Sequence, residues 1–404
     1  MAATPNQTSS DQTAPAGQRR QVTVLFADMA GYTAVAEALG DNKRLSRFLF
    51  ETGYAHIFAC QAEIGRQLLD RSKALAKADG DELAVAYADL GFMWHRMFWG
   101  QPGEARDSAQ RETGKRVVEV ARRHSDIWLA SKAQLANGLD YSAWGRPGES
   151  RAALMELMAM SRETNDPRPR SMALWALAVT DVFSDNYDGA IEKADDALRI
   201  CLSPIDRMAA EGYRMVARTL SGQEDEVSAL GGHVIRKMEA KSLAMVLPPV
   251  KMTVGVGNIM QGNMAKGVAM VNAAQAEAEN WGMTFATALG NKFLGEIYLQ
   301  FVLSDEKPSL SVMLANLPFL VRTLPFAKKK ARRHLQDALE GFQGLNSPAD
   351  IAGAQYNLGL LDKAAKRNDR ARTSLLEARG IAQSVDATNI ISNADAALAE
   401  LGAA

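Results

Sequence analysis

The stretch YNLGLLDKAAKRNDRARTSLLEA, residues 356–378, decides the fold of this chain. It holds two segments with apolar residues at helical spacing, joined by a short polar turn at residues 366–369. Small residues stand at Gly359, Ala371 and Ala378, twelve and then seven positions apart. Only small side chains let two helix backbones approach closely where they cross. This spacing therefore predicts a helix pair that crosses at these three residues.

The same spacing recurs along the chain, in phase with short turns. It is found in Ala178, Ala190 and Ala197, in Gly255, Gly267 and Ala274, and at two of three positions in Gly138, Ser150 and Leu157. Turns that contain Gly, Pro, Asp or Asn begin at residues 99, 144, 184, 221 and 261, which gives intervals of 45, 40, 37 and 40 residues. A period of this size with two helices per unit is typical of a helical solenoid, and the small residues resemble those of the tetratricopeptide repeat (TPR).

The composition of the 404 residues agrees with a helical fold. Ala, Leu and Met supply most of the apolar residues, and only 7% of the chain is aromatic, a balance that favours helices over sheets. We therefore expect an all-α, TPR-like solenoid of helix–turn–helix units, preceded by a short N-terminal β-strand.

Charge, cysteine content and hydropathy limit the partners and the location. Lys and Arg number 46 and Asp and Glu 47, so the net charge indicates neither a nucleic-acid nor a membrane partner. The two cysteines, Cys60 and Cys201, are too few for a disulfide framework, which favours a cytoplasmic location. The most apolar stretch, residues 308–327, contains Arg322 and interior prolines, so we expect no membrane-spanning helix.

Residues 1–40 differ in composition from the repeats. Residues 1–18 are small, polar and Pro-containing, so we expect a disordered tail that is not a signal peptide. The β-branched and aromatic run QVTVLFA, residues 21–27, predicts a strand that ends at Asp28. Gly31 marks the next turn, and a helix is expected from Thr33 to Gly40.

The segment RRQVTVLFADMAGYTAVAEALGD, residues 19–41, resembles the opening of the class III adenylate/guanylate cyclase catalytic domain. In that family a strand ending in Phe-x-Asp passes into a Gly-containing turn and a helix. The resemblance implies that Asp28 ligates two divalent metals with help from the carbonyl of Met29. It also implies that Met29, Gly31, Tyr32 and Thr33 lie near the phosphates of a nucleotide.

Two-metal chemistry needs a second carboxylate to share the ions, and Asp81 is the candidate. It lies in DGDELAVAY, residues 79–87, 53 residues after Asp28, which is several more than the family usually has. The same residues are also typical of a turn between repeats, with a helix opening at Leu83. Residues 41–80 discriminate between the two interpretations, because the enzyme needs a strand there and a repeat array needs helices only.

Most of residues 39–400 resembles the C-terminal part of large bacterial proteins that join a class III cyclase domain, an ATPase module and a TPR array. The resemblance includes GRQLLDRSKALAKADGDELAVAYADLG and residues 315–342. This chain keeps only the first strand, turn and helix of the cyclase. The expected division is therefore a tail at 1–18, a truncated cyclase start at 19–40, TPR-like repeats at 41–302 and 329–404, and an interruption at 303–328.

These observations favour a TPR-like interaction scaffold, derived from a cyclase multidomain protein, linked to cyclic-nucleotide signalling and not itself catalytic. Its partner would be a protein or peptide in the concave groove, with no nucleic acid, membrane or cofactor, and the strand at residues 21–27 would support a dimer. The alternative is a class III cyclase, a phosphorus-oxygen lyase that forms cyclic AMP or cyclic GMP with two Mg²⁺ or Mn²⁺ ions bound by Asp28 and Asp81.

The basic run KKKARR, residues 328–333, allows two interpretations. It forms either a docking patch for an acidic partner or the solvated face of a long helix that leads into the next repeat. The second is favoured, because HLQDALEGF, residues 334–342, continues the run at helical spacing.

Overall fold

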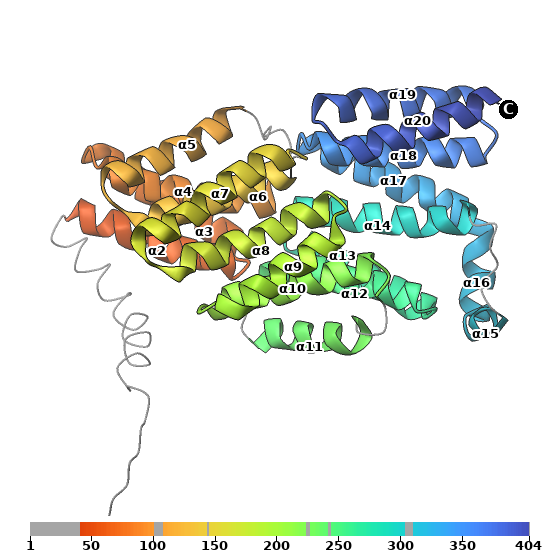
Figure 1. The fold of residues 1–404 in the computed structure, drawn as a ribbon, viewed down its shortest axis with the longest axis horizontal. Helices are drawn as coiled ribbons and strands as arrows, with labels where there is room; N and C mark the ends of the chain where they lie inside the picture. The colour runs from red at the N-terminus through yellow and green to blue at the C-terminus, as the bar shows by residue number, and fades with distance from the viewer. Residues whose placement is uncertain are drawn as a thin grey trace, which may run out of the picture.

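The computed structural model describes residues 41–100, 108–143, 145–223, 227–240, 244–303 and 310–403 (Figure 1). Within these ranges every regular element is helical, and the two short 3-10 turns are η2 (Ala244–Val246) and η3 (Leu324–Phe326). The all-α expectation is thus confirmed for the described residues. The predicted tail, the predicted strand at residues 21–27 and the helix expected from Thr33 lie outside them.

Successive helices form antiparallel pairs. The first helices of the pairs are α2 (Asn42–Phe58), α4 (Glu82–Trp99), α6 (Ile127–Ala143), α8 (Pro167–Phe183), α10 (Pro204–Leu220), α12 (Leu247–Met260), α14 (Thr284–Leu303) and α18 (Pro348–Ala364). The second helices are α3 (Ala62–Ala78), α5 (Ser108–Arg123), α7 (Pro147–Thr164), α9 (Tyr187–Ile200), α11 (Val227–Ala240), α13 (Met264–Asn280), α17 (Ala327–Gly344) and α19 (Asn368–Ser384). After these eight pairs, α20 (Thr388–Ala403) takes the place of a ninth first helix.

The predicted small residues lie where the two helices of a pair cross. A Cβ atom added to Gly267 of α13 would be 2.4 Å from the carbonyl oxygen of Gly255 in α12. In the α6–α7 pair, Ser150 Oγ donates to the carbonyl oxygen of Gly138 over 2.8 Å. These contacts confirm the crossings, since any larger side chain would push the backbones apart.

One further crossing was not noticed in the sequence. Gly53, Gly65 and Ser72 have the same spacing, and a Cβ atom on Gly53 would lie 2.9 Å from the carbonyl oxygen of Gly65. Ser72 is fully buried and its Oγ donates to the carbonyl oxygen of Ser46 over 2.6 Å. The third residue of this triplet is the polar Ser72, which differs from the Ala found at that position in three of the four triplets identified in the sequence.

An insertion separates the two helices of the seventh pair. Between α14 and α17 lie α15 (Leu310–Ala315), α16 (Leu317–Thr323) and η3. The pair nevertheless packs closely, because a Cβ atom on Gly295 would lie 2.7 Å from Leu335. The basic run opens α17, where Ala331 and Leu335 are buried while Lys328 and Lys329 are exposed. The run therefore forms the start of a helix of the seventh pair, with Lys328 and Lys329 on its exposed face.

The array curves until it contacts itself five pairs further along the chain (Figure 1). Hydrogen bonds across this contact run from Trp99 Nε1 to Trp281 O (2.9 Å), from Thr284 Oγ1 to Trp99 O (3.4 Å) and from Ser347 Oγ to Ala143 O (3.5 Å). Asn389 Nδ2 also donates to Asp185 Oδ2 (2.6 Å) and to the carbonyl oxygen of Ser184 (3.5 Å). They join the second pair to the seventh, the third to the eighth and the fourth to α20. The curvature therefore has a constant pitch over this part of the array.

In the part of the chain that the structure describes, none of the helices combines the length and the apolar character needed to cross a bilayer.

The close crossing at Gly267 yields a prediction about stability. Gly267→Ala should lower the free energy of unfolding by about 2 kcal/mol, because the added methyl group meets the backbone of α12. The control is Gly380→Ala in α19, where an added Cβ meets nothing within 4 Å and stability should rise by up to about 1 kcal/mol. Urea unfolding followed by circular dichroism measures both. Equal effects at the two sites would contradict the crossing.

Candidate partner-binding surface

The first helices lie on the concave side of the array. Each first helix contacts the next, from α2 through α20, whereas consecutive second helices make no comparable contacts among the described residues. In a curved stack the elements on the inside of the curve are closest together. The first helices therefore form the inner face, and their side chains decide what that face can bind.

Lys132 on α6 is a half-buried ammonium group in the middle of the inner face. Its Nζ lies 3.3 Å from Met172 Sδ on α8, which is a weak acceptor, and no carboxylate of the described residues forms an ion pair with it. Burial lowers the pKa of Lys132, while Asp206 opposes this effect and Arg168 adds to it. Holding an ammonium group in this poorly solvated position lowers the free energy of unfolding.

Asp206 on α10 is the carboxylate that acts electrostatically on Lys132, and its side chain is 6% exposed. Trp175 Nε1 on α8 donates to Asp206 Oδ1 over 3.1 Å. Burial raises the pKa of Asp206, although Lys132 and Trp175 favour the ionised form. Three consecutive first helices thus bring a Lys, a Trp and an Asp together, which we name the Lys132 cluster.

A second group of charges lies where the array contacts itself. Lys292 Nζ on α14 is 3.4 Å from Asp350 Oδ1 on α18, and Glu296 Oε1 accepts from Asn357 Nδ2 over 2.9 Å. Asp185, from the turn after α8, acts electrostatically on both Lys292 and Glu296. We name Asp185, Lys292, Glu296 and Asp350 the acidic cluster, because it holds three carboxyl groups and one ammonium group.

Burial and neighbouring charges both shift the pKa values in the acidic cluster. Burial raises the pKa of Glu296, and Asp350 and Asp185 raise it further against the opposing effect of Lys292 and Asn357. Burial would lower the pKa of Lys292, but the Asp350 and Glu296 carboxyl groups outweigh it and raise that pKa. An added cation would therefore be stabilised here.

Aromatic side chains cover the inner face near α2, α4 and α6. The rings of Tyr87 and Trp128 stack with centroids 5.8 Å apart, and Tyr54 meets Trp128 edge-on at 6.3 Å. Trp128 is 41% exposed, and the Arg47 guanidinium group lies 3.3 Å from the centre of the Tyr87 ring. Tyr87 is buried, so the exposed ring of Trp128 is the part of this group that can accept an apolar or a cationic side chain.

Other buried charges serve the fold instead. Asp89 of α4 pairs with Lys73 (2.5 Å) of α3 and Arg116 (2.9 Å) of α5. Asp181 of α8 pairs in the same way with Arg151 of α7 and Lys193 of α9. Each aspartate connects its own helix pair to the second helix of the preceding pair. Because basic side chains already neutralise these carboxylates, they are not available to bind a ligand.

Asp81, the candidate second metal ligand, lies at the N-terminus of α4. Its Oδ1 accepts from the backbone N–H of Ala84 over 3.0 Å, which is an N-cap, and its Oδ2 is 3.8 Å from Lys43 Nζ. Residues 41–80 contain α2 and α3 and no strand, as an array of repeats requires. Asp28, Met29, Gly31, Tyr32 and Thr33 lie outside the described residues.

A depression of about 450 Å³ surrounds Asp81 and is lined by Lys43, Asp79, Gly80, Asp81, Glu82 and His124. Glu82 pairs with Arg123 (2.7 Å) and His124 (2.8 Å), and these hydrogen bonds lower the pKa of its carboxyl group. Within the described ranges, no group of three His, Cys, Asp or Glu side chains is arranged to hold a metal. The acids of this depression act as helix cap and ion-pair partners.

Sequence reasoning missed the Lys132 cluster and the acidic cluster. Both contain charged residues inside otherwise apolar segments, ASKAQLA (130–136) and GNKFLGEIY (290–298). A charge that interrupts the apolar part of a repeat helix could have identified Lys132, Lys292 and Glu296.

Comparison with known proteins shows the fold and no family. No protein-family model and no curated protein matches the sequence. Among solved structures the chain is similar to a Rap protein complexed with Competence and Sporulation Factor. That similarity has a TM-score of 0.53 and 10% identity, and it covers 89% of this chain and 99% of that one. It shows that this chain has the fold of a helical repeat protein.

A circular tandem repeat protein with a novel repeat topology also matches. It has 11% identity over 95% of this chain and 89% of that one, with a TM-score of 0.22. At that score the arrangement of its helices has no bearing on this chain.

Lys132 yields a prediction that separates folding from binding. Lys132→Met should raise the free energy of unfolding by about 1 kcal/mol, because an apolar side chain of similar size replaces a poorly solvated ammonium group. The control is Lys266→Met on the exposed surface of α13, which should change stability by less than about 0.5 kcal/mol. Chemical unfolding at pH 7 measures both. A loss of stability in Lys132→Met would show that the ammonium supports the fold.

Proposed function

We propose that this protein is a TPR-like interaction scaffold that binds a protein or peptide segment along the inner face of the first helices. The observation that carries the proposal is the group of poorly solvated, incompletely paired charges on that face. Lys132 forms no direct ion pair among the described residues and is influenced only electrostatically by Asp206, and the acidic cluster holds more carboxyl groups than ammonium groups. Natural proteins retain such destabilising groups where function requires them.

The chemistry of the inner face specifies the partner. The acidic cluster fits a Lys or Arg side chain, and Lys132 fits a carboxylate. The exposed ring of Trp128, beside Tyr54 and Tyr87, fits an apolar or cationic side chain. The similar Rap structure is a complex with Competence and Sporulation Factor, which supports the use of this fold for binding another molecule.

Glu296 provides the test of this function. Labelled pools of random peptides, one enriched in Lys and Arg and one in Asp and Glu, are titrated with the protein and followed by fluorescence anisotropy. The basic pool should bind more tightly, and Glu296→Gln should weaken that binding about tenfold, because one charge-assisted hydrogen bond is lost.

The matched control is Glu279→Gln, an exposed carboxylate of α13 that forms no ion pair among the described residues. It should leave the affinity unchanged. Equal affinity for the two pools, or equal loss in the two variants, would contradict binding at the acidic cluster.

The origin from a cyclase multidomain protein and the link to cyclic-nucleotide signalling are a further part of the proposal. They rest on the resemblance of residues 19–41 and of the array to that family. The division at residues 18, 40, 302 and 328, a dimer through residues 21–27 and a cytoplasmic location belong to the same proposal. The free thiols of Cys60 and Cys201 support the location.

A cyclase assay tests the proposed absence of catalysis. The purified protein is incubated with ATP and then with GTP in Mn²⁺, beside Asp28→Ala. We expect no cyclic nucleotide from either protein, because residues 41–80 provide helices where a cyclase needs a strand. Activity that disappears in Asp28→Ala would overturn the scaffold and return Asp28 and Asp81 to a metal site.

A further inference from the structure

The insertion between α14 and α17 exposes a group of large apolar side chains. Leu314, Leu317, Val321, Leu324 and Phe326 are each between 48% and 64% exposed. Single exposed apolar residues are common on proteins, but five within residues 314–326 form a continuous feature that needs an explanation. We name these five side chains the apolar patch.

The insertion is anchored to the array, so the exposure of the patch is not a result of loose packing. Asn316 is 5% exposed, and its Nδ2 donates to the carbonyl oxygen of Gly262 over 2.6 Å. Leu320 and Thr323 of α16 are buried, and Phe319 meets the ring of Phe301 at 6.2 Å. One side of α16 thus belongs to the core while the other is held outward.

The segment that carries the patch is rich in basic residues. Residues 310–336 contain six Lys or Arg and no Asp or Glu, in a chain whose net charge is −1. Arg322, Lys328 and Lys329 are exposed, and no carboxylate of the described residues pairs with them. Their charge is therefore available to an anionic partner.

The shape of the insertion favours a flat partner. Figure 1 shows α15 and α16 projecting from the array beside α14. A helix from another protein binds in a groove, whereas a protruding apolar surface with basic residues around it suits the interface of a bilayer. The anionic headgroups complement Arg322, Lys328 and Lys329, and the acyl region accepts the apolar patch.

We propose that the α15–α16 insertion docks this protein on the surface of an anionic lipid bilayer. The apolar patch enters the interface, and Arg322, Lys328 and Lys329 contact lipid phosphates. This is peripheral binding and needs no spanning helix. It differs from the expectation, based on net charge, that the protein has no membrane partner, because the positive charge is local.

Vesicle flotation tests the proposal with the full chain. Vesicles of phosphatidylcholine mixed with phosphatidylglycerol should carry the protein, and vesicles of phosphatidylcholine alone should carry much less. Lys328→Glu with Lys329→Glu should weaken binding at least about tenfold, since each basic residue near the surface contributes to attraction. Added salt should also weaken it. Val321→Asp with Leu324→Asp should abolish it.

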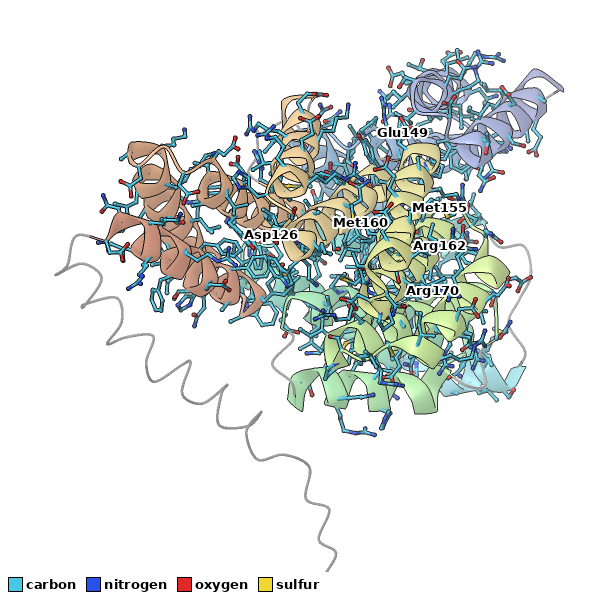
Figure 2. The ribbon with its side chains drawn as sticks, turned by 60° about the vertical axis from the view of Figure 1, so that its left-hand side comes forward. Asp126, Glu149, Met155, Met160, Arg162 and Arg170 are labelled. Carbon is cyan, nitrogen blue, oxygen red and sulfur yellow. The ribbon has the colours of Figure 1, made fainter. Side chains whose placement is uncertain are left out.

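Matched controls lie on α7 and α8, where Figure 2 shows Met155, Arg162 and Arg170. Arg162→Glu with Arg170→Glu makes the same change of charge as the Lys328 and Lys329 variant. Met155→Asp places a carboxylate on an apolar side chain that is 52% exposed. These controls should float like the wild type. All variants change exposed residues, and unchanged thermal unfolding confirms their fold.

Three outcomes would overturn the proposal. In the first, the wild type floats equally with both vesicle types. In the second, the Lys328 and Val321 variants float as well as the wild type. In the third, the protein does not float but forms dimers that Val321→Asp dissociates. The last would identify a self-association surface. Binding of the basic peptide pool should survive Lys328→Glu with Lys329→Glu, so the two proposals fail independently.

Discussion

The contact between helix backbones at small residues is the constraint on which the whole array depends. Gly255 and Gly267 bring α12 and α13 so close that no Cβ atom fits between them, and Gly53 and Gly65 do the same for α2 and α3. A close crossing sets the angle within each pair. Repetition of that angle then sets how each pair stacks on the next, and hence the curvature of the array.

The curvature of the array brings together charged side chains from repeats that are far apart in the chain. Because the array contacts itself five pairs further along, Asp185 from the fourth pair meets charges from the seventh and eighth pairs. Asp185 joins the acidic cluster only through this closure. A small change in the crossing angle would separate its members, so the close packing at glycine and the charge on the inner face are parts of one arrangement.

Charges in this molecule have two distinct roles. Asp89 and Asp181 are buried but fully paired, and they connect successive repeats. Lys132 is half-buried and has no ion-pair partner among the described residues, and burial lowers its pKa. Burial alone does not distinguish these roles, whereas the presence or absence of a neutralising partner does. The same criterion separates Arg332, which pairs with Asp362, from the unpaired Lys328 and Lys329.

The sequence by itself determined the helices, the turns between them, four of the crossings and the basic face of α17. These features depend on residues within about forty positions, where spacing and turn chemistry act locally. The spacing of small residues did not predict the crossing of α2 and α3, because the third residue of that triplet, Ser72, is polar. Only the tertiary structure decided that Lys132 lacks an ion pair within the described ranges, that Asp185 acts electrostatically on Glu296, and that the apolar patch is exposed. These features depend on how pairs that are far apart in the chain come together. That arrangement follows from the curvature of the array, which is the sum of small rotations over many repeats and cannot be seen in the sequence of one repeat.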